Sequence, residues 1–259
     1  MRKFQLLDIK LIDLDTFKYF NGAEEFENEF KHYAESKFEY KFYNYSEAEE
    51  AEKLLLKLNL HYNKFYGTEV ESDEDIITHP AFYIIFSANY KTAVKEENTF
   101  FINSKKMGKK NFQTDMDEDF LIMTKKGMEF FKNEIPEVKF EKILDTTKKT
   151  EYYKVIYLPE LDFPIIYKKA LELKEFRNFK NEYSIKSDGR TDLEDDAIKE
   201  IKKNKLLKCK TFKLGEKIYP NVFSLTLISG ELAFKIKQNF NLKEEGIYIT
   251  PIILDQMEE

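Results

Sequence analysis

The chain has 259 residues, of which 42% are hydrophobic, so it can bury one large core or two smaller ones. Its formal net charge of −6 argues against a general nucleic-acid binder, because neutralising phosphates requires a cationic face. The sequence has no apolar run near the ~20 residues that cross a bilayer, and the single cysteine, Cys209, excludes an intrachain disulfide.

The first part of the chain alternates between strand and helix patterns. Residues 3–14 alternate apolar and polar side chains with one phase change, which predicts a bent strand. This opening is too acidic and too interrupted for a signal peptide, so we expect a cytoplasmic location. Aromatic residues at helical spacing predict a helix over 23–36. Ser46, with Glu49 three residues later, predicts a capping box that opens a second helix.

An acidic stretch separates these elements from the next strand. The run Glu69–Asp75 predicts an exposed loop, and residues 82–87 form a continuous apolar strand pattern. Residues 88–119 give mixed signals, with a short strand at 99–103 and a second acidic run at 115–119.

A strand–helix–strand unit is predicted after that acidic run. Residues 120–123 form a strand, Thr124 caps a helix over 125–133, and residues 138–143 return as a strand. Pro136 ends the helix, because proline cannot continue the helical hydrogen bonding.

The middle of the chain starts with the segment Asp145–Thr150, which we expect to be a linker. A strand follows at 151–158. Residues 165–180 give an ambiguous pattern, in which Ile166, Ala170 and Leu173 fit a helix. Asp192 predicts the cap of a helix that ends near residue 204, and residues 206–214 form another strand.

The stretch 222–254 repeats the strand–helix–strand pattern in a clearer form. Ser229 is the expected helix cap, and Gly246 is expected in the turn before the closing strand. The two similar units are consistent with a duplication and equally with coincidence.

These elements predict an α+β fold with largely antiparallel sheets flanked by helices. A strand–helix–strand unit then occurs twice in the chain. The expected division is an N-terminal half over 1–145 and a C-terminal half over 151–259, and the alternative is one continuous domain.

Motifs for catalysis or cofactor binding are missing from the sequence. The eight glycines lack the spacing of a phosphate loop, and His32, His61 and His79 lie too far apart for the helical zinc pair. Cys209 lies between two lysines that would lower the pKa of its thiol, but no histidine follows it to act as a base. We expect no cofactor and no metal. A catalytic carboxylate pair would leave no sequence mark, so a hydrolase-type enzyme stays an alternative.

The acidic run at 115–119 has the alternation of a calcium loop. The sixth position of such a loop must be glycine, and here it is Phe120. The twelfth position requires a bidentate glutamate, and here it is Lys126. The calcium interpretation therefore fails, and a solvated acidic turn or a contact for a basic partner is left.

Three segments in the C-terminal half carry a family resemblance: EYYKV at 151–155 with Asp162 after it, KIYPNVF at 217–223, and LISGELAFKIKQNFNLKEEGIYITPI at 227–252. In this order they resemble bacterial immunity proteins of polymorphic toxin systems. One departure is Ile166, where members tend to have a serine four residues after the aspartate. The resemblance implies a protein that binds and neutralises a toxin made by the same cell, and it brings no catalytic residues.

The leading hypothesis is therefore a non-enzymatic, cytoplasmic binding protein whose partner is a cognate protein toxin. A dimeric structural or regulatory scaffold is a further alternative, and the sequence does not determine the oligomeric state. We expect no nucleic-acid partner and no membrane partner. Acidic residues that match a cationic toxin, or that form plain solvated turns, are Glu69, Glu71, Asp73, Glu74, Asp75, Asp115, Asp117, Glu118 and Asp119.

Overall fold

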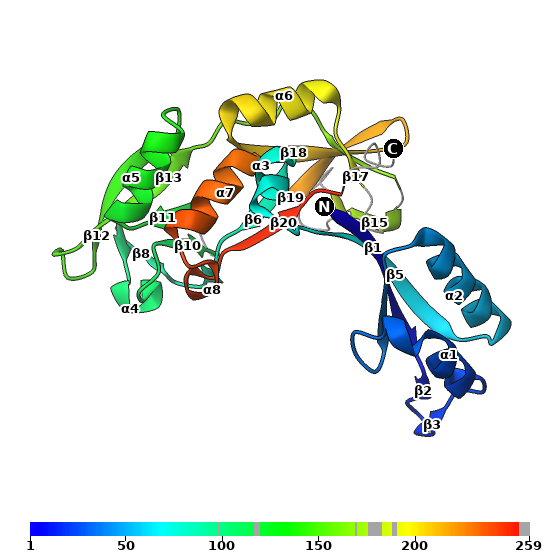
Figure 1. Cartoon of the computed structure of the whole chain (residues 1–259). Helices are drawn as coiled ribbons and strands as arrows, with labels where there is room; N and C mark the ends of the chain where they lie inside the picture. Colours follow the sequence, from blue (N-terminus) through cyan, green and yellow to red (C-terminus); the bar gives the residue numbers. More distant parts are fainter. Residues whose placement is uncertain (98, 117–119, 169, 176–182, 188–190, 254–259) are drawn as a thin grey trace.

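The computed structural model is an α+β fold in which helices pack on largely antiparallel sheets, and this confirms the predicted fold class. Figure 1 shows a small N-terminal unit that extends from a larger body. Among the described residues, no helix is both long and apolar enough to span a membrane. The structure describes residues 1–97, 99–116, 120–168, 170–175, 183–187 and 191–253.

The N-terminal unit is a three-stranded antiparallel sheet with helices packed against it. Strand β1 (Arg2–Lys10) lies between β4 (Glu39–Phe42) and β5 (His61–Glu69). Helices α1 (Ala23–Phe30) and α2 (Tyr45–Lys57) supply the other half of the core. The unit therefore closes a hydrophobic core within the first 69 residues.

Strand alternation explains this core. Leu7 and Ile9 of β1 are fully buried, because alternate residues of a strand point to the same face. They meet Phe26 of α1 and Leu55 of α2, which are also fully buried. The pattern confirms the strand and both helices expected in this region, with shorter bounds.

Helix α3 (Asp73–Thr78) and strand β6 (Phe82–Ile85) lead the chain into the body. The first sheet of the body has the order β7-β10-β11-β13-β12-β9-β8. Helices α4 (Ser104–Met107) and α5 (Lys125–Glu134) belong to the same segment. Its strands are β7 (Ala88–Asn89), β8 (Ala93–Glu96), β9 (Thr99–Ile102), β10 (Phe112–Asp115), β11 (Phe120–Met123), β12 (Lys139–Asp145) and β13 (Glu151–Tyr157).

The second sheet of the body has the order β15-β16-β19-β18-β14-β17, and β6 joins β19 to β20. Helices α6 (Asp195–Asn204), α7 (Gly230–Asn239) and α8 (Leu242–Glu245) accompany it. Its strands are β14 (Ile165–Tyr167), β15 (Ala170–Glu175), β16 (Tyr183–Ser187), β17 (Thr191–Asp192), β18 (Leu206–Leu214), β19 (Lys217–Ile228) and β20 (Tyr248–Pro251).

The body contains the same topology twice. In residues 82–145, β7 is parallel to β10, β10 is antiparallel to β11, and α5 connects β11 to β12. In residues 151–251, β14 is parallel to β18, β18 is antiparallel to β19, and α7 leads from β19 towards β20. We call these two segments the first and second repeat.

The two repeats exchange one strand each. Strand β13, which begins the second repeat, pairs antiparallel with both β11 and β12 of the first repeat. Strand β6, which begins the first repeat, pairs antiparallel with both β19 and β20 of the second repeat. Each helix-connected pair of strands is therefore held together by a strand of the other repeat.

Backbone hydrogen bonds repeat along with the topology. Thr124 N donates to Asn111 O at 3.0 Å, and at the equivalent place Ser229 N donates to Lys205 O at 2.9 Å. In both repeats the hydroxyl before the helix accepts the backbone N–H three residues later, which confirms the two predicted caps. The strand–helix–strand units are equivalent in hydrogen bonding as well as in order.

Helices α5 and α7 fill a common core between the two sheets. Phe131 and Ile135 of α5 lie in the same buried cluster as Ile236 of α7 and Phe240. The Phe112 ring is 5.6 Å from the Phe131 ring and 4.7 Å from the Phe240 ring, in edge-to-face contact. The repeats are thus joined by packing as well as by strand exchange.

The expected linker Asp145–Thr150 is a hairpin turn. Strands β12 and β13 pair antiparallel on either side of it, with Leu144 opposite Glu151. Asp145 stabilises the turn by accepting hydrogen bonds from Lys149 N and Thr150 N. The expected seam between residues 145 and 151 thus lies within a sheet, whereas the N-terminal unit ends near residue 69.

Three local predictions were wrong. The segment 165–180 is strand, not helix, where the structure describes it, because β14 and β15 pair in the second sheet. Helix α2 is capped by Asn44, whose side chain accepts from Ser46 N, instead of by Ser46. Helix α6 begins after Glu194 instead of Asp192, and Asp192 accepts from the adjacent Leu193 N.

Gly230 allows α7 to pack against α3. A Cβ atom at this position would lie 2.1 Å from Ile76 O and 2.6 Å from His79 O, which are backbone atoms. We predict that Gly230→Ala lowers the free energy of unfolding by about 2 kcal/mol or more through overpacking. Lys125→Ala, at the equivalent exposed position of α5, is the control and should change it by less than about 0.5 kcal/mol. Denaturant titration of both variants measures this, and equal stabilities would contradict the packing argument.

His79, at the end of α3, contacts the backbone directly after strand β20. Its Nε2 lies 2.9 Å from Ile252 O, and burial lowers the pKa of His79 to about 4. An unfolded histidine titrates near ~6.5, so below that pH the unfolded state binds more protons and stability falls until about pH 4.

We predict that this loss approaches about 3 kcal/mol across the window. His79→Gln retains an N–H donor and should flatten the decline, whereas His61→Gln, on the exposed end of β5, should not. Urea titrations between pH 4 and pH 7 measure the difference, and an unchanged slope in His79→Gln would exclude this histidine as its source.

Candidate functional site

The predicted acidic loop at 69–75 is bound to the chain itself. Glu69, at the end of β5, forms an ion pair with Lys41 and accepts a hydrogen bond from Tyr43 Oη at 2.5 Å. The Lys41 ammonium also lies 4.3 Å from the centre of the Phe4 ring. These hydrogen bonds, led by that from Lys41, lower the pKa of Glu69.

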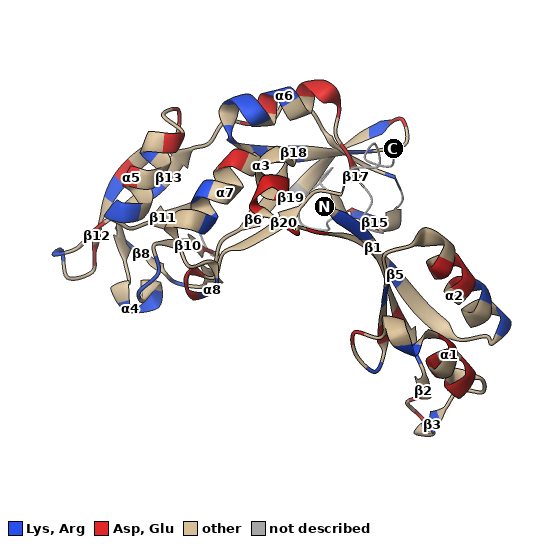
Figure 2. Cartoon of the chain, viewed as in Figure 1, with Lys and Arg blue, Asp and Glu red and all other residues tan. Residues whose placement is uncertain are grey.

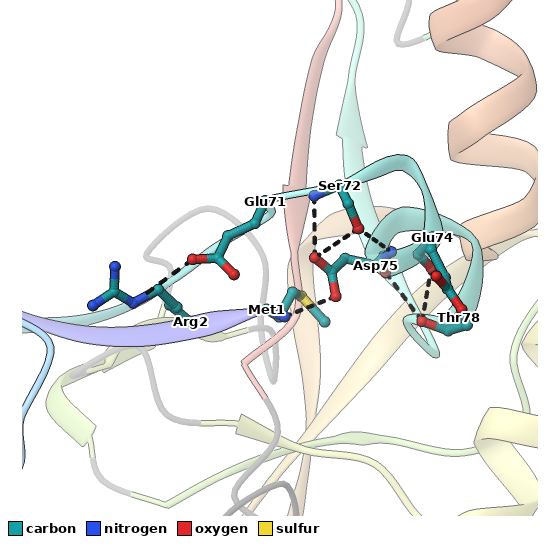
Figure 3. Close-up of polar contacts among 7 residues, drawn as sticks. All are labelled: Met1, Arg2, Glu71, Ser72, Glu74, Asp75 and Thr78. Carbon is teal, nitrogen blue, oxygen red and sulfur yellow. Dashed lines mark hydrogen bonds and ion pairs between the residues drawn. The ribbon is translucent and has the colours of Figure 1, made fainter.

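The next acidic residues begin a helix. Figure 3 shows the Ser72 hydroxyl and the Asp75 carboxylate in a reciprocal capping box, which starts α3. Asp75 also accepts from the N-terminal ammonium of Met1 at 2.7 Å, and this contact lowers its pKa. Glu71 lies 3.6 Å from the guanidinium of Arg2. The predicted loop is therefore in part a helix, and its carboxylates join the N-terminal unit to the body.

The two remaining residues of this run, Asp73 and Glu74, differ in their contacts. Asp73 forms an ion pair with Lys237 of α7 at 3.0 Å. The side chain of Glu74 is exposed, and its carbonyl oxygen accepts from Thr78 Oγ1 at 2.8 Å. Partner contact at residues 69–75 stays a prediction, with Glu74 the most accessible carboxylate.

Asp115, the first residue of the second acidic run, does not lie in an exposed turn. Asp115 ends β10, is fully buried, and accepts a hydrogen bond from Ala93 N at 2.7 Å. Residues Asp117, Glu118 and Asp119 lie outside the described residues. The prediction of surface contact is therefore wrong for Asp115, because its carboxylate bonds a neighbouring strand.

A larger exposed surface lies at the far end of the N-terminal unit. Strands β2 (Ile12–Asp13) and β3 (Lys18–Tyr19) form a short hairpin there. Leu14 and Phe17 in its turn are 67% and 84% exposed, which is unusual for large apolar side chains. With Tyr19 and Phe38, also exposed, they form what we call the apolar tip.

The backbone at the apolar tip is strained. Phe17 has a φ of 53°, in the left-handed region that bulky residues rarely adopt. Lys37 lies over the rings of Tyr19 and Phe38, at 5.2 and 5.6 Å from their centres. The hairpin thus holds an aromatic ring in solvent at a conformational cost.

A groove continues from the tip along the sheet. Its volume is about 490 Å³. Ile12, Leu14 and Phe38 line the groove, as do His61 and Tyr62 of β5 and the charged residues Asp8 and Lys10 of β1. The tip and groove together form one continuous surface of apolar and aromatic side chains.

Acidic helices flank this surface. Residues 23–52 contain ten glutamates and three lysines, a formal charge of −7, whereas the whole chain carries −6. Glu24 and Glu29 of α1 and Glu49 and Glu50 of α2 are exposed, and Figure 2 shows acidic residues along both helices. The negative charge of the protein is therefore concentrated in the N-terminal unit.

Sequence reasoning missed this surface because it relied on contiguous acidic runs. The glutamates of α1 and α2 are separated by apolar residues that face the core, so they form no run in the sequence. A count of charge over a 30-residue window would have found them. Phe17 carries no sequence signal, because exposure of a single phenylalanine depends on tertiary structure.

A second cavity, of about 540 Å³, lies between the two sheets of the body. Its lining residues are mainly apolar and include no carboxylate. The buried carboxylates elsewhere are held by hydrogen bonds, such as Glu245, which accepts from Asn111 N and Nδ2 at 2.5 and 2.6 Å. In the described part of the chain, no group of three His, Cys, Asp or Glu residues could hold a metal ion.

Cys209 is a buried residue of β18. Its sulfur lies 3.2 Å from Thr211 O, and burial raises the pKa of the thiol. The flanking lysines project away to the sheet's other side and to solvent, so they do not produce the thiolate that the sequence left open.

Comparisons of this chain with protein-family models, with curated proteins and with solved structures gave no match. The arrangement of the N-terminal unit therefore carries the functional argument. It combines an exposed apolar tip, an adjoining groove and flanking acidic helices, and these are features of a surface that contacts a macromolecule.

Proposed function

We propose that this protein is a non-enzymatic binding protein that neutralises a cognate bacterial toxin by direct contact. The resemblance of residues 151–259 to immunity proteins supports a toxin as the partner. The apolar tip and groove of the N-terminal unit support direct binding, because contiguous exposed apolar surface commonly marks an interaction site.

The exposed Phe17 ring is the observation that carries the proposal. A bulky residue with positive φ costs on the order of 1–3 kcal/mol, and such strain clusters at functional positions. An aromatic ring presented at the centre of an apolar patch is also the usual form of an interface hot spot. The toxin therefore receives Phe17 in an apolar pocket, with Leu14 beside it.

The negative charge of the N-terminal unit indicates that the toxin surface it contacts is cationic. The exposed glutamates of α1 and α2 give the N-terminal unit a negative potential, which attracts a cationic partner and speeds its encounter. The contact consists of an apolar centre and an acidic rim.

The direct test is rescue of growth. We expect the upstream neighbouring reading frame to encode a large secreted protein with a toxin domain at its C-terminus. Expression of that domain should arrest growth, and co-expression of this chain should restore it through a complex that survives size-exclusion chromatography. A toxin that is still active in the presence of the folded chain would overturn the proposal.

Phe17→Gly separates binding from stability. The substitution removes the ring and relieves the positive φ, so we predict equal or higher stability, by up to about 1 kcal/mol. Affinity for the toxin domain should fall about tenfold or more. Calorimetry and thermal unfolding measure the two effects. Ile218→Ser, an exposed position on the body, is the matched control, and equal affinities of the two variants would exclude the tip.

Charge reversal tests the acidic rim. Glu24→Lys with Glu29→Lys should slow association with the toxin domain about tenfold at low salt and much less at high salt. Glu137→Lys with Glu216→Lys makes the same change in net charge on exposed positions of the body. Stopped-flow association rates decide the outcome, and similar slowing by both pairs would assign the effect to net charge alone.

A further inference from the structure

The cavity in the body lies where the two repeats cross. Phe86, after β6, and Leu158, after β13, occupy equivalent positions on the two exchanged segments, and both line it. Phe120 of β11 and Leu225 of β19 are a second equivalent pair in its wall. The cavity therefore lies on the pseudo-two-fold axis that relates the repeats.

The described lining of this cavity combines nine apolar residues with seven that carry a hydroxyl group. Its volume of about 540 Å³ falls within the range of small-molecule sites, which commonly form between packed units. Tyr83 and Tyr167 both line it and share a side-chain hydrogen bond. Burial raises the pKa of both phenols, so they stay neutral.

The second repeat has a lysine at a position where the first repeat has a threonine. Thr114 of β10 and Lys208 of β18 occupy the same position: Thr114 N donates to Ser87 O and Lys208 N donates to Pro159 O, both at 2.8 Å. Both residues line the cavity, and Lys208 is the only charged one among the lining residues that the structure describes.

Lys208 is a half-buried residue, and its ammonium has no ion-pair partner in the part of the chain that the structure describes. Its neighbours differ in this respect. Lys210 pairs with Glu160, and Lys205 pairs with Glu231 at 3.1 Å. A half-buried cation with no counter-ion, beside an apolar cavity, is suited to an anion attached to an apolar group.

We propose that this cavity binds a small apolar carboxylate, with its hydrocarbon part between the two sheets and its carboxylate at Lys208. The cavity walls supply apolar burial, and the lysine supplies a charge-assisted hydrogen bond. Because both repeats line the cavity, a bound molecule stabilises the body as a whole. The inference concerns a site on the body and is independent of toxin binding by the N-terminal unit.

Decanoate, below its micelle concentration, is the probe, and decanol is the matched neutral control. We expect decanoate to raise the melting temperature of the full chain and to bind more tightly than decanol in titration calorimetry. Lys208→Met removes the ammonium but keeps an unbranched apolar side chain, and it should weaken decanoate about tenfold or more, to the level of decanol. Lys210→Met, which removes an exposed and already paired lysine, should leave decanoate binding unchanged.

Ala88→Phe is a second variant, because Ala88 lines the cavity on the short edge strand β7, and a larger side chain there reduces the volume. It should weaken decanoate and decanol alike. No melting shift with decanoate, or equal decanoate affinity in wild type and Lys208→Met, would overturn the proposal. Loss of decanoate binding in Lys210→Met would also overturn it, because the effect would then follow overall charge.

Discussion

The exchange of β6 and β13 is the constraint on which the body depends. In each repeat the strands before and after the long helix run parallel and do not touch, so their backbone groups need an antiparallel strand between them. That strand comes from the other repeat in both cases. Removing either one would leave the strands beside it without a neighbour on that edge and expose the core beneath α5 and α7. Neither repeat can therefore complete its sheet alone, and the body must form as one cooperative unit. The cavity between the sheets is a consequence, because the two crossing segments separate the sheets where they pass.

The N-terminal unit uses the same motif without exchange. Strands β4 and β5 are connected by α2 and flank β1, so the middle strand comes from the unit itself. Its core is separate, and the polar joint to the body consists of contacts such as Arg2 with Glu71 and Met1 with Asp75. The Arg2–Glu71 pair is exposed and contributes little to stability, about 0–1 kcal/mol, whereas the Met1–Asp75 pair is partly buried. A unit that closes its own core and is joined in this way tolerates a changed surface without loss of the body's fold, which suits a variable binding surface.

The sequence predicted what local chemistry decides. Thr124 and Ser229 cap their helices as expected, and Pro136 follows the end of α5. The sequence-based predictions failed where contacts between distant segments determine the structure. Residues 165–167 and 170–175 have apolar spacing compatible with a helix, but pairing with β18 and β16 makes them strands. The sequence predicts a linker at Asp145–Thr150 where the structure has a hairpin turn, because a polar, lysine-rich segment is equally typical of both. The exchange itself has no sequence mark, since β6 and β13 differ from other apolar strands only in their partners. Of the predicted contact residues, Asp115 was misplaced because burial beside β8 is also decided by tertiary structure.

The net charge of the chain is unevenly distributed along the sequence. A charge of −6 spread over 259 residues would serve only solubility. Here residues 23–52 carry −7, so the rest of the chain is close to neutral. Because screening limits electrostatic attraction to about 10 Å at ordinary ionic strength, a partner responds to this local charge and not to the total. We propose that a cationic partner is drawn to the exposed glutamates of α1 and α2 and not to the body. In the proposed complex these glutamates orient the approach, and the exposed Phe17 ring, already held by its backbone, forms the contact.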